Sequence, residues 1–202
     1  MVFGALQNPK APEGNVTGVT YFVPIGRIFD VIKQCFPNAK SVGFLGEKGH
    51  PGTIVDQKGT SEEAEARGLK YYEAICSTPD EVRKAAGDLA KKADLLIVSN
   101  QALINSNVST ILEVANQAKK PLVSYVEKPV KSGAVLGISV DHDKLGTWLA
   151  DSVAEVPVKG KSIKDVPVKS EPNPIILVNP QMMEFLGLNF PPSVMGKAKT
   201  VD

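Results

Sequence analysis

A glycine-rich segment holds the first residues whose spacing points to ligand binding. Glycines recur every three residues from Gly43 to Gly52 and lead into a helix that we predict to begin at Thr53. Flexible backbone amides at a helix N-terminus can hold a carboxylate or a phosphate, and a nearby lysine or histidine can add charge or a hydrogen bond. The candidate ligand-binding residues here are Gly46, Lys48, His50 and Thr53. An ordinary glycine-rich turn explains the spacing equally well, and the segment matches neither GxGxxG nor a P-loop.

Polar residues also follow a short apolar segment at Leu95–Val98. Ser99, Asn100 and Gln101 come directly after it. Short hydroxyl and amide side chains at the end of a strand can bind the polar edges of a ligand, or they can cap the next helix. We favour ligand binding for these three residues because they stand where a strand ends.

A third cluster follows the apolar segment Leu122–Val126. Tyr125 could stack on a ligand, and Glu127 could accept hydrogen bonds from an ammonium group. For Glu127 and the adjacent Lys128, a solvated loop is at least as good an interpretation. Thr20, which closes an earlier β-branched segment, completes the candidate set.

The elements that would position these residues alternate between strand and helix. Short, near-continuous apolar segments are typical of strands that are buried on both faces of a sheet. They lie at Ser41–Leu45, Tyr71–Ile75, Leu95–Val98 and Leu122–Val126. Helical patterns at 53–68, 78–92 and 105–119 fill the gaps, so the strands should run parallel with right-handed crossovers. Ligands bind beyond the carboxyl ends of such strands, so the three clusters should share one edge.

The rest of the chain shows a less regular pattern. We predict strands at 2–6, 15–20, 133–140 and 175–178, and helices at 25–36 and 181–186, the last closed by Gly187. A further helix should start at Asp141 or Asp143 and run through Val153, and 156–174 should be an extended connector. Thr78 should cap a helix, with Glu81 in a capping box.

Composition excludes several classes of function. The 202 residues carry a formal net charge of +1 without a basic block, so nothing indicates binding to nucleic acid or to an anionic membrane. Cys35 and Cys76 suit small buried side chains better than a disulfide, and no cysteine or histidine cluster has metal-ligand spacing. The acids flanking His142 are more typical of helix caps than of a metal site. We therefore expect no catalytic residue, no metal and no cofactor.

The N-terminus has none of the features of a leader. It lacks a basic start and a long apolar run, so no signal peptide is expected in this chain. Taken at face value the chain is not exported; the other interpretation is that it is a piece of a longer exported protein.

The order of segments resembles one known family. The motifs that carry the resemblance are Gly14-Asn-Val-Thr-Gly-Val-Thr20, Phe36-Pro-Asn-Ala-Lys40 before a Val-Gly-Phe-Leu strand, Val114-Ala-Asn-Gln-Ala-Lys119, Lys131-Ser-Gly-Ala-Val-Leu-Gly137, and Val178-Asn-Pro-Gln with Leu186-Gly-Leu. They look like ABC-transporter substrate-binding proteins of the group that includes tryptophan and tyrosine binders, and the resemblance covers essentially the whole chain. The loops at Gly46–Gly52, Asn100–Leu103 and Tyr125–Pro129 depart from the family pattern.

The resemblance implies a type I periplasmic-binding-protein fold, with two α/β lobes and a ligand in the cleft between them. The fold class would be α/β, a parallel sheet with helices on both faces. Residues 23–135 and 166–202 would form a nearly complete second lobe, and residues 1–22 and 136–165 would be a remnant of the first. The resemblance also implies a periplasmic or extracellular location.

We expect the solute-binding component of an ABC transporter, with a small polar ligand such as an amino acid. One alternative is a nucleotide- or phosphate-binding enzyme on a flavodoxin-like sheet, and another is a truncated assembly unit that binds nothing. The partners would be the ligand and, for a full-length protein, a transporter permease. Unpaired strand edges and uncovered apolar residues in the first-lobe remnant favour a homodimer.

Overall fold

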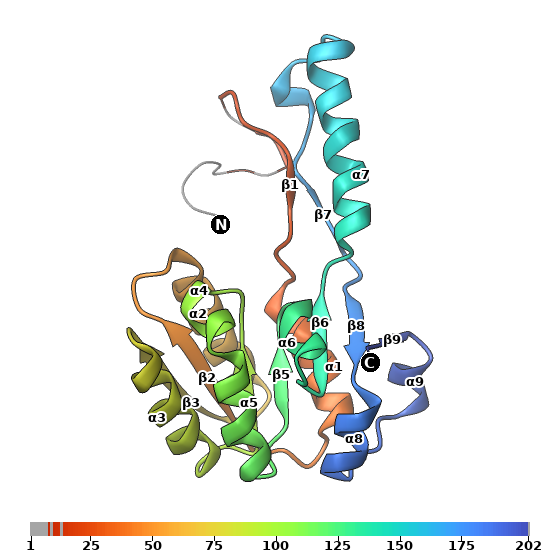
Figure 1. The fold of residues 1–202 in the computed structure, drawn as a ribbon. Coiled ribbons are helices and arrows are strands. Elements are labelled where there is room, and N and C mark those ends of the chain that lie inside the picture. Colours follow the sequence, from red (N-terminus) through yellow and green to blue (C-terminus); the bar gives the residue numbers. More distant parts are fainter. Residues whose placement is uncertain (1–7, 9, 13, 202) are drawn as a thin grey trace. The chain divides into compact units, whose positions relative to one another are not determined.

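The computed structural model describes residue 8, residues 10–12 and residues 14–201 (Figure 1). The chain divides into two compact units. The smaller unit comprises the chain up to Val23 together with Val140–Pro174, and the larger unit comprises Pro24–Ser139 and Ile175–Asp202. The strand that we expected at residues 2–6 lies outside the described residues.

The larger unit is built on a seven-stranded sheet in the order β3-β2-β4-β5-β6-β8-β9. Only β6 and β8 pair antiparallel, and every other neighbouring pair is parallel. The strands are β2 (Ser41–Glu47), β3 (Lys70–Cys76), β4 (Leu95–Val98), β5 (Leu122–Ser124), β6 (Leu136–Ser139), β8 (Ile175–Val178) and β9 (Ala198–Thr200). The predicted α/β class with a parallel sheet is confirmed.

Helices cover both faces of this sheet. From β2 the chain moves outward to β3 and then crosses back to β4, so right-handed crossovers place α2 and α3 on opposite faces. α1 packs against α2, and α3 packs against α5 (Figure 1). The helices are α1 (Ile25–Cys35), α2 (Pro51–Ala66), α3 (Pro79–Ala90), α4 (Ala102–Ser106), α5 (Val108–Gln117), α6 (Glu127–Lys131), α8 (Pro180–Leu186) and α9 (Pro192–Met195).

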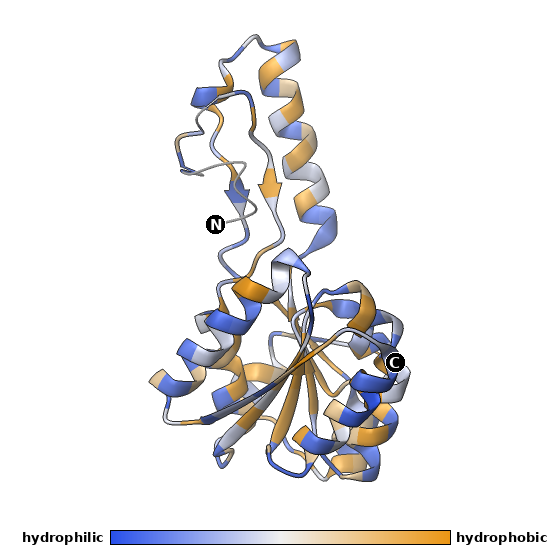
Figure 2. Cartoon of the chain, turned by 90° about the vertical axis from the view of Figure 1, so that its left-hand side faces the viewer, coloured by the Kyte–Doolittle hydropathy of each residue, from blue (hydrophilic) through white to orange (hydrophobic). Residues whose placement is uncertain are grey.

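The core lies between the sheet and these helices. Val98, Ile104, Ile111 and Leu96 are fully buried in one cluster that extends to α3 and α5. Figure 2 shows most strands of the larger unit as apolar, whereas its helices alternate between apolar and polar residues. That alternation is typical of helices that bury one side against a sheet. Cys35 and Cys76 are both buried and unbonded, as predicted.

Several element boundaries differ from the sequence-based expectation. β2 continues to Glu47 and α2 begins at Pro51, so Gly46, which we expected in the loop after the strand, lies inside the strand. The expected helix at 105–119 is divided between α4 and α5 at Asn107. β9 was not expected, because a polar three-residue strand carries no apolar pattern; it pairs with β8.

The described residues of the smaller unit include one short parallel strand pair and the helix α7. β1 (Val19–Thr20) pairs with β7 (Lys169–Ser170), and α7 (His142–Val153) contacts β1. A π-helical turn at Ala154–Val158 and a 3-10 turn at Ile163–Asp165 lie in the segment that we expected to be extended. Asp141 caps α7 by accepting a hydrogen bond from the backbone N–H of Lys144 at 3.1 Å.

The expected lobe boundaries place two strands wrongly. Residues 136–139 were assigned to the first lobe, but they form β6, which lies between β5 and β8 in the larger sheet. All four residues are buried, and a strand whose two faces are both buried belongs inside a sheet that helices cover on both faces. Residues 166–174 were assigned to the second lobe, but β7 pairs with β1 in the smaller unit.

Candidate functional site

The sheet order brings the three predicted clusters to one edge. β4 lies between β2 and β5, and all three strands run in the same direction. Their carboxyl ends therefore meet at the same edge of the sheet, as expected. The loops that follow these strands belong to one compact unit, so the site can be described within that unit.

A polar stripe on α2 runs along this edge. Thr53, Asp56 and Thr60 are spaced three and four residues apart, which places them on one face of the helix. The Thr53 hydroxyl donates to the carbonyl oxygen of Glu47 at the end of β2, at 2.7 Å. The Thr60 hydroxyl lies 2.8 Å from the hydroxyl of Tyr125, which follows β5. Asp56 lies between these two anchors, and the loop after β4 lies between the loops after β2 and β5.

Ser99 and Gln101 in that loop are almost completely buried, each with 1% of its surface exposed. The Gln101 side-chain oxygen accepts from the backbone N–H of Glu47 at 2.7 Å. The Gln101 side-chain nitrogen donates to the Ser99 hydroxyl oxygen, also at 2.7 Å. Gln101 therefore links the ends of β2 and β4, and Ser99 keeps its own proton free to donate.

Asp56 is the acid that these groups surround. Burial raises the pKa of the Asp56 carboxyl, while hydrogen bonding from Ser99, the charge of His50 and hydrogen bonding from Gln101 lower it, and the balance is a raised pKa. Sequence reasoning missed Asp56 because it looked only at strand ends. The available signal was its spacing from Thr53 and Thr60, which marks one helix face as polar.

His50 and Lys48 border the site without entering this network. His50 caps α2, since its Nδ1 accepts from the backbone N–H of Gly52 at 3.1 Å. The Lys48 side chain is exposed, and its backbone N–H donates to the carbonyl oxygen of Cys76 at 2.8 Å. Gly46 is buried in β2, where an added Cβ would meet the Thr53 side chain at 2.9 Å.

The remaining predicted residues make other contacts. The Asn100 side-chain oxygen accepts from the side-chain amide of Asn105 at 2.9 Å. Glu127 forms an ion pair with Lys131 at 2.6 Å. Tyr125 is 8% exposed, and burial raises the pKa of its hydroxyl. Thr20 belongs to the smaller unit, where its hydroxyl accepts from the backbone N–H of Phe22 at 3.1 Å.

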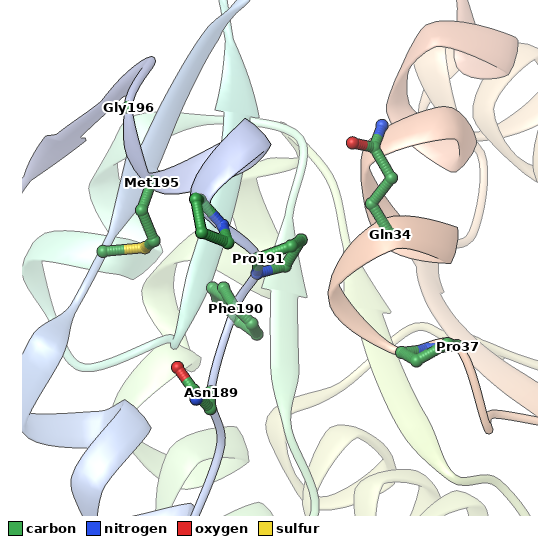
Figure 3. Close-up of a pocket in the computed structure, with 8 residues that line it drawn as sticks. Gln34, Pro37, Asn189, Phe190, Pro191, Met195 and Gly196 are labelled. Carbon is green, nitrogen blue, oxygen red and sulfur yellow. The ribbon is translucent and has the colours of Figure 1, made fainter.

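A hollow in the larger unit lies away from this edge of the sheet. It has a volume of about 740 Å³ and separates the C-terminal end of α1 from the segment around α9 (Figure 3). Figure 3 shows Gln34 and Pro37 on the α1 side, and Phe190, Pro191 and Met195 opposite them. None of the residues that line this hollow is ionisable, so it offers no charged side chain to a polar ligand.

Among the described residues, no group of three or more histidine, cysteine or acidic side chains could hold a metal ion. No helix in this part of the chain has the length and apolar character needed to cross a membrane.

The chain is similar to proteins of known family. The family model described as ABC transporter substrate binding protein matches residues 3–202. The tyrosine-binding protein of Clostridioides difficile (strain R20291) is 28% identical over 185 residues, which are 92% of this chain and 53% of that protein. The chain thus spans about half the length of this curated relative.

Solved structures match the same region. A conserved domain protein from Vibrio cholerae is 25% identical with a TM-score of 0.85, over 98% of this chain and 66% of that one. An ABC domain from Streptococcus pneumoniae, solved in complex with L-Trp, is 25% identical with a TM-score of 0.84, over 98% of this chain and 68% of that one.

Proposed function

Because the chain belongs to the ABC transporter substrate-binding protein family, we propose that it is the solute-binding component of an ABC transporter and binds a small polar ligand such as an amino acid. The observation that carries this proposal is the polar stripe of α2, which meets the loops after β2, β4 and β5 at one edge of the sheet. The names of the relatives, a tyrosine-binding protein and an L-Trp complex, support an aromatic amino acid as the first ligand to test.

The ligand would lie at the loop formed by Ser99, Asn100 and Gln101 and would reach Asp56 on the α2 stripe, with the almost fully buried Ser99 and Gln101 holding Asp56 from behind. Family membership favours this binding role over the alternative of an enzyme on a flavodoxin-like sheet. It also supports a periplasmic or extracellular location and a transporter permease as the protein partner. A solute-binding protein of this kind would bind and release its ligand without chemistry.

Ligand-dependent stabilisation tests the proposal. Thermal unfolding is followed with L-tyrosine, L-tryptophan or ATP at concentrations from 10 µM to 10 mM, chosen to exceed dissociation constants of about 1 µM to 1 mM. A ligand that binds the folded state stabilises it by about 2.7 kcal/mol at 100 times its dissociation constant. A rising transition temperature with either amino acid and none with ATP is expected. A response to ATP alone would favour the nucleotide-binding alternative.

We also propose that two chains associate through the smaller unit. Large apolar side chains are exposed there on β1 and α7 and near them, including Tyr21 at 53%, Leu149 at 45% and Val153 at 55%. Apolar groups of this size on a two-stranded unit favour a partner surface. Light scattering at micromolar concentration should give twice the mass of the chain, and a stable monomer would contradict the proposal.

A further inference from the structure

We propose that Asp56 determines the specificity of the site by receiving the cationic amine of the ligand on its carboxylate. The inference rests on the proposed function, since it names the ligand group that this edge of the sheet recognises. It assigns the ammonium contact to a residue of α2 and not to Glu127.

The position of Asp56 is fixed from both sides. Thr53, three residues earlier, is held by the carbonyl oxygen of Glu47, and Thr60, four residues later, is held by the Tyr125 hydroxyl. Both threonines are buried, with 4% and 0% of their surface exposed. A helix anchored at both points cannot rotate, so the intervening acid stays directed at the loop after β4.

Burial disfavours a negative charge on Asp56, and two neighbouring side chains partly offset that effect. Ser99 and Gln101 are rigid because each is almost fully buried and bonded to the other. Hydrogen bonding from these two side chains favours the ionised carboxylate. These groups are neutral donors, so they orient the charge without cancelling it.

Asp56 has no lysine or arginine partner among the described residues. Two other shielded acids do have a cationic partner: Glu171 is 3% exposed and lies 2.6 Å from the Lys144 ammonium, and Glu63 contacts the Arg67 guanidinium. A partly buried carboxylate is stabilised by an opposite charge. A ligand ammonium would supply that charge.

Glu127 is a weaker acceptor by the same criterion. Its carboxylate already lies 2.6 Å from the Lys131 ammonium, in an ion pair between residues four positions apart on α6. A ligand amine would have to displace this lysine. His50 is the charged or titratable neighbour that bears most on Asp56, and its imidazole is engaged at the start of α2.

Three probes separate the amine from the carboxylate. Isothermal titration is performed with L-tyrosine, with tyramine, which keeps only the amine, and with 3-(4-hydroxyphenyl)propionate, which keeps only the carboxylate. Each is titrated into the unaltered protein, into Asp56→Asn, and into Glu62→Gln. The last variant removes one negative charge from an exposed position on the same helix, where Glu62 pairs with Lys58.

Asp56→Asn should weaken L-tyrosine and tyramine by about 10- to 100-fold, the factor for loss of a charge-assisted hydrogen bond. The affinity of Asp56→Asn for the propionate should equal or exceed that of the unaltered protein. Glu62→Gln should bind all three probes with the affinities of the unaltered protein. If L-tyrosine binds the unaltered protein and Asp56→Asn equally well, the role of Asp56 is refuted while the proposed function stands. Tighter binding of the propionate than of tyramine to the unaltered protein refutes it without any variant. If none of the three probes binds the unaltered protein and L-tryptophan does not bind it either, the proposed function itself fails.

Discussion

The hydrogen bond between Thr60 and Tyr125 joins α2 to the loop after β5, and a double-mutant cycle can measure it. The hydroxyl oxygens lie 2.8 Å apart, and the two residues are 0% and 8% exposed. The cycle consists of Thr60→Val, Tyr125→Phe and the double variant. Both substitutions remove a hydroxyl and nearly preserve the shape of the side chain.

The expected magnitudes follow from burial. Each single variant leaves one buried hydroxyl without its partner, which costs about 1–3 kcal/mol of the free energy of unfolding. The double variant removes both hydroxyls, so it loses the net value of a single hydrogen bond, about 0.5–1.5 kcal/mol. The sum of the single effects should therefore exceed the effect of the double variant by about 1 kcal/mol or more.

Urea unfolding of the four proteins at pH 7 gives these free energies. Burial raises the pKa of Tyr125, so its hydroxyl stays protonated at this pH and ionisation does not enter the comparison. Tyr71→Phe serves as a control, because that hydroxyl donates to the exposed side chain of Glu73 at 2.8 Å and its loss should have a smaller effect. Effects of Thr60→Val and Tyr125→Phe that add within about 0.3–0.5 kcal/mol would show that the two hydroxyls are not coupled.

Four further substitutions test other parts of the larger unit. Gly46→Ala should lower the free energy of unfolding, measured in urea, by about 1–3 kcal/mol, because its Cβ would meet three side chains at 2.9 Å. Gly49→Ala has open space around its Cβ but a φ of +78°, so it should lose about 1–2 kcal/mol to backbone strain alone. Asp56→Asn should stabilise the ligand-free protein at pH 7, because the raised pKa of Asp56 means that its ionisation opposes folding. This gain in the free energy of unfolding should vanish as the pH falls to about 4, where aspartate in the unfolded chain is also protonated. Thr78→Ala should cost about 0.5–2 kcal/mol in the same urea assay, because the Thr78 hydroxyl accepts from the backbone N–H of Glu81 at 3.3 Å; no loss would mean that this contact does not cap α3.

Sequence patterns predicted those parts of the fold that depend on local rules. Apolar runs located β4 and β8, Thr78 located the start of α3, and Gly187 closes α8 with a φ of 65°. Each of these patterns spans only a few residues, and the position of the strand or helix end follows from the local apolar pattern or from a single φ angle. They also fixed the direction of the strands, and hence the edge at which the candidate loops meet.

The features that sequence patterns missed depend on distant partners. β9 is recognisable only through its pairing with β8, and β7 only through its pairing with β1. Glu127 looks like a free acid until Lys131 is placed beside it. Asp56 looks like an ordinary helix-surface acid, and only the contacts of Thr53 and Thr60 show which way its face of α2 points.

Gly46 shows how the glycine spacing and the ligand site are connected. The regular glycines suggested an anion-binding loop, yet Gly46 lies inside β2, where a Cβ atom would stand 2.9 Å from the methyl group of Thr53. Without that Cβ, α2 can approach closely enough for the Thr53 hydroxyl to bond the carbonyl oxygen of Glu47. The same approach sets Asp56 beside Ser99 and Gln101. Gly46 therefore allows α2 to pack closely on β2, and through that packing it would support the proposed role of Asp56 in ligand binding.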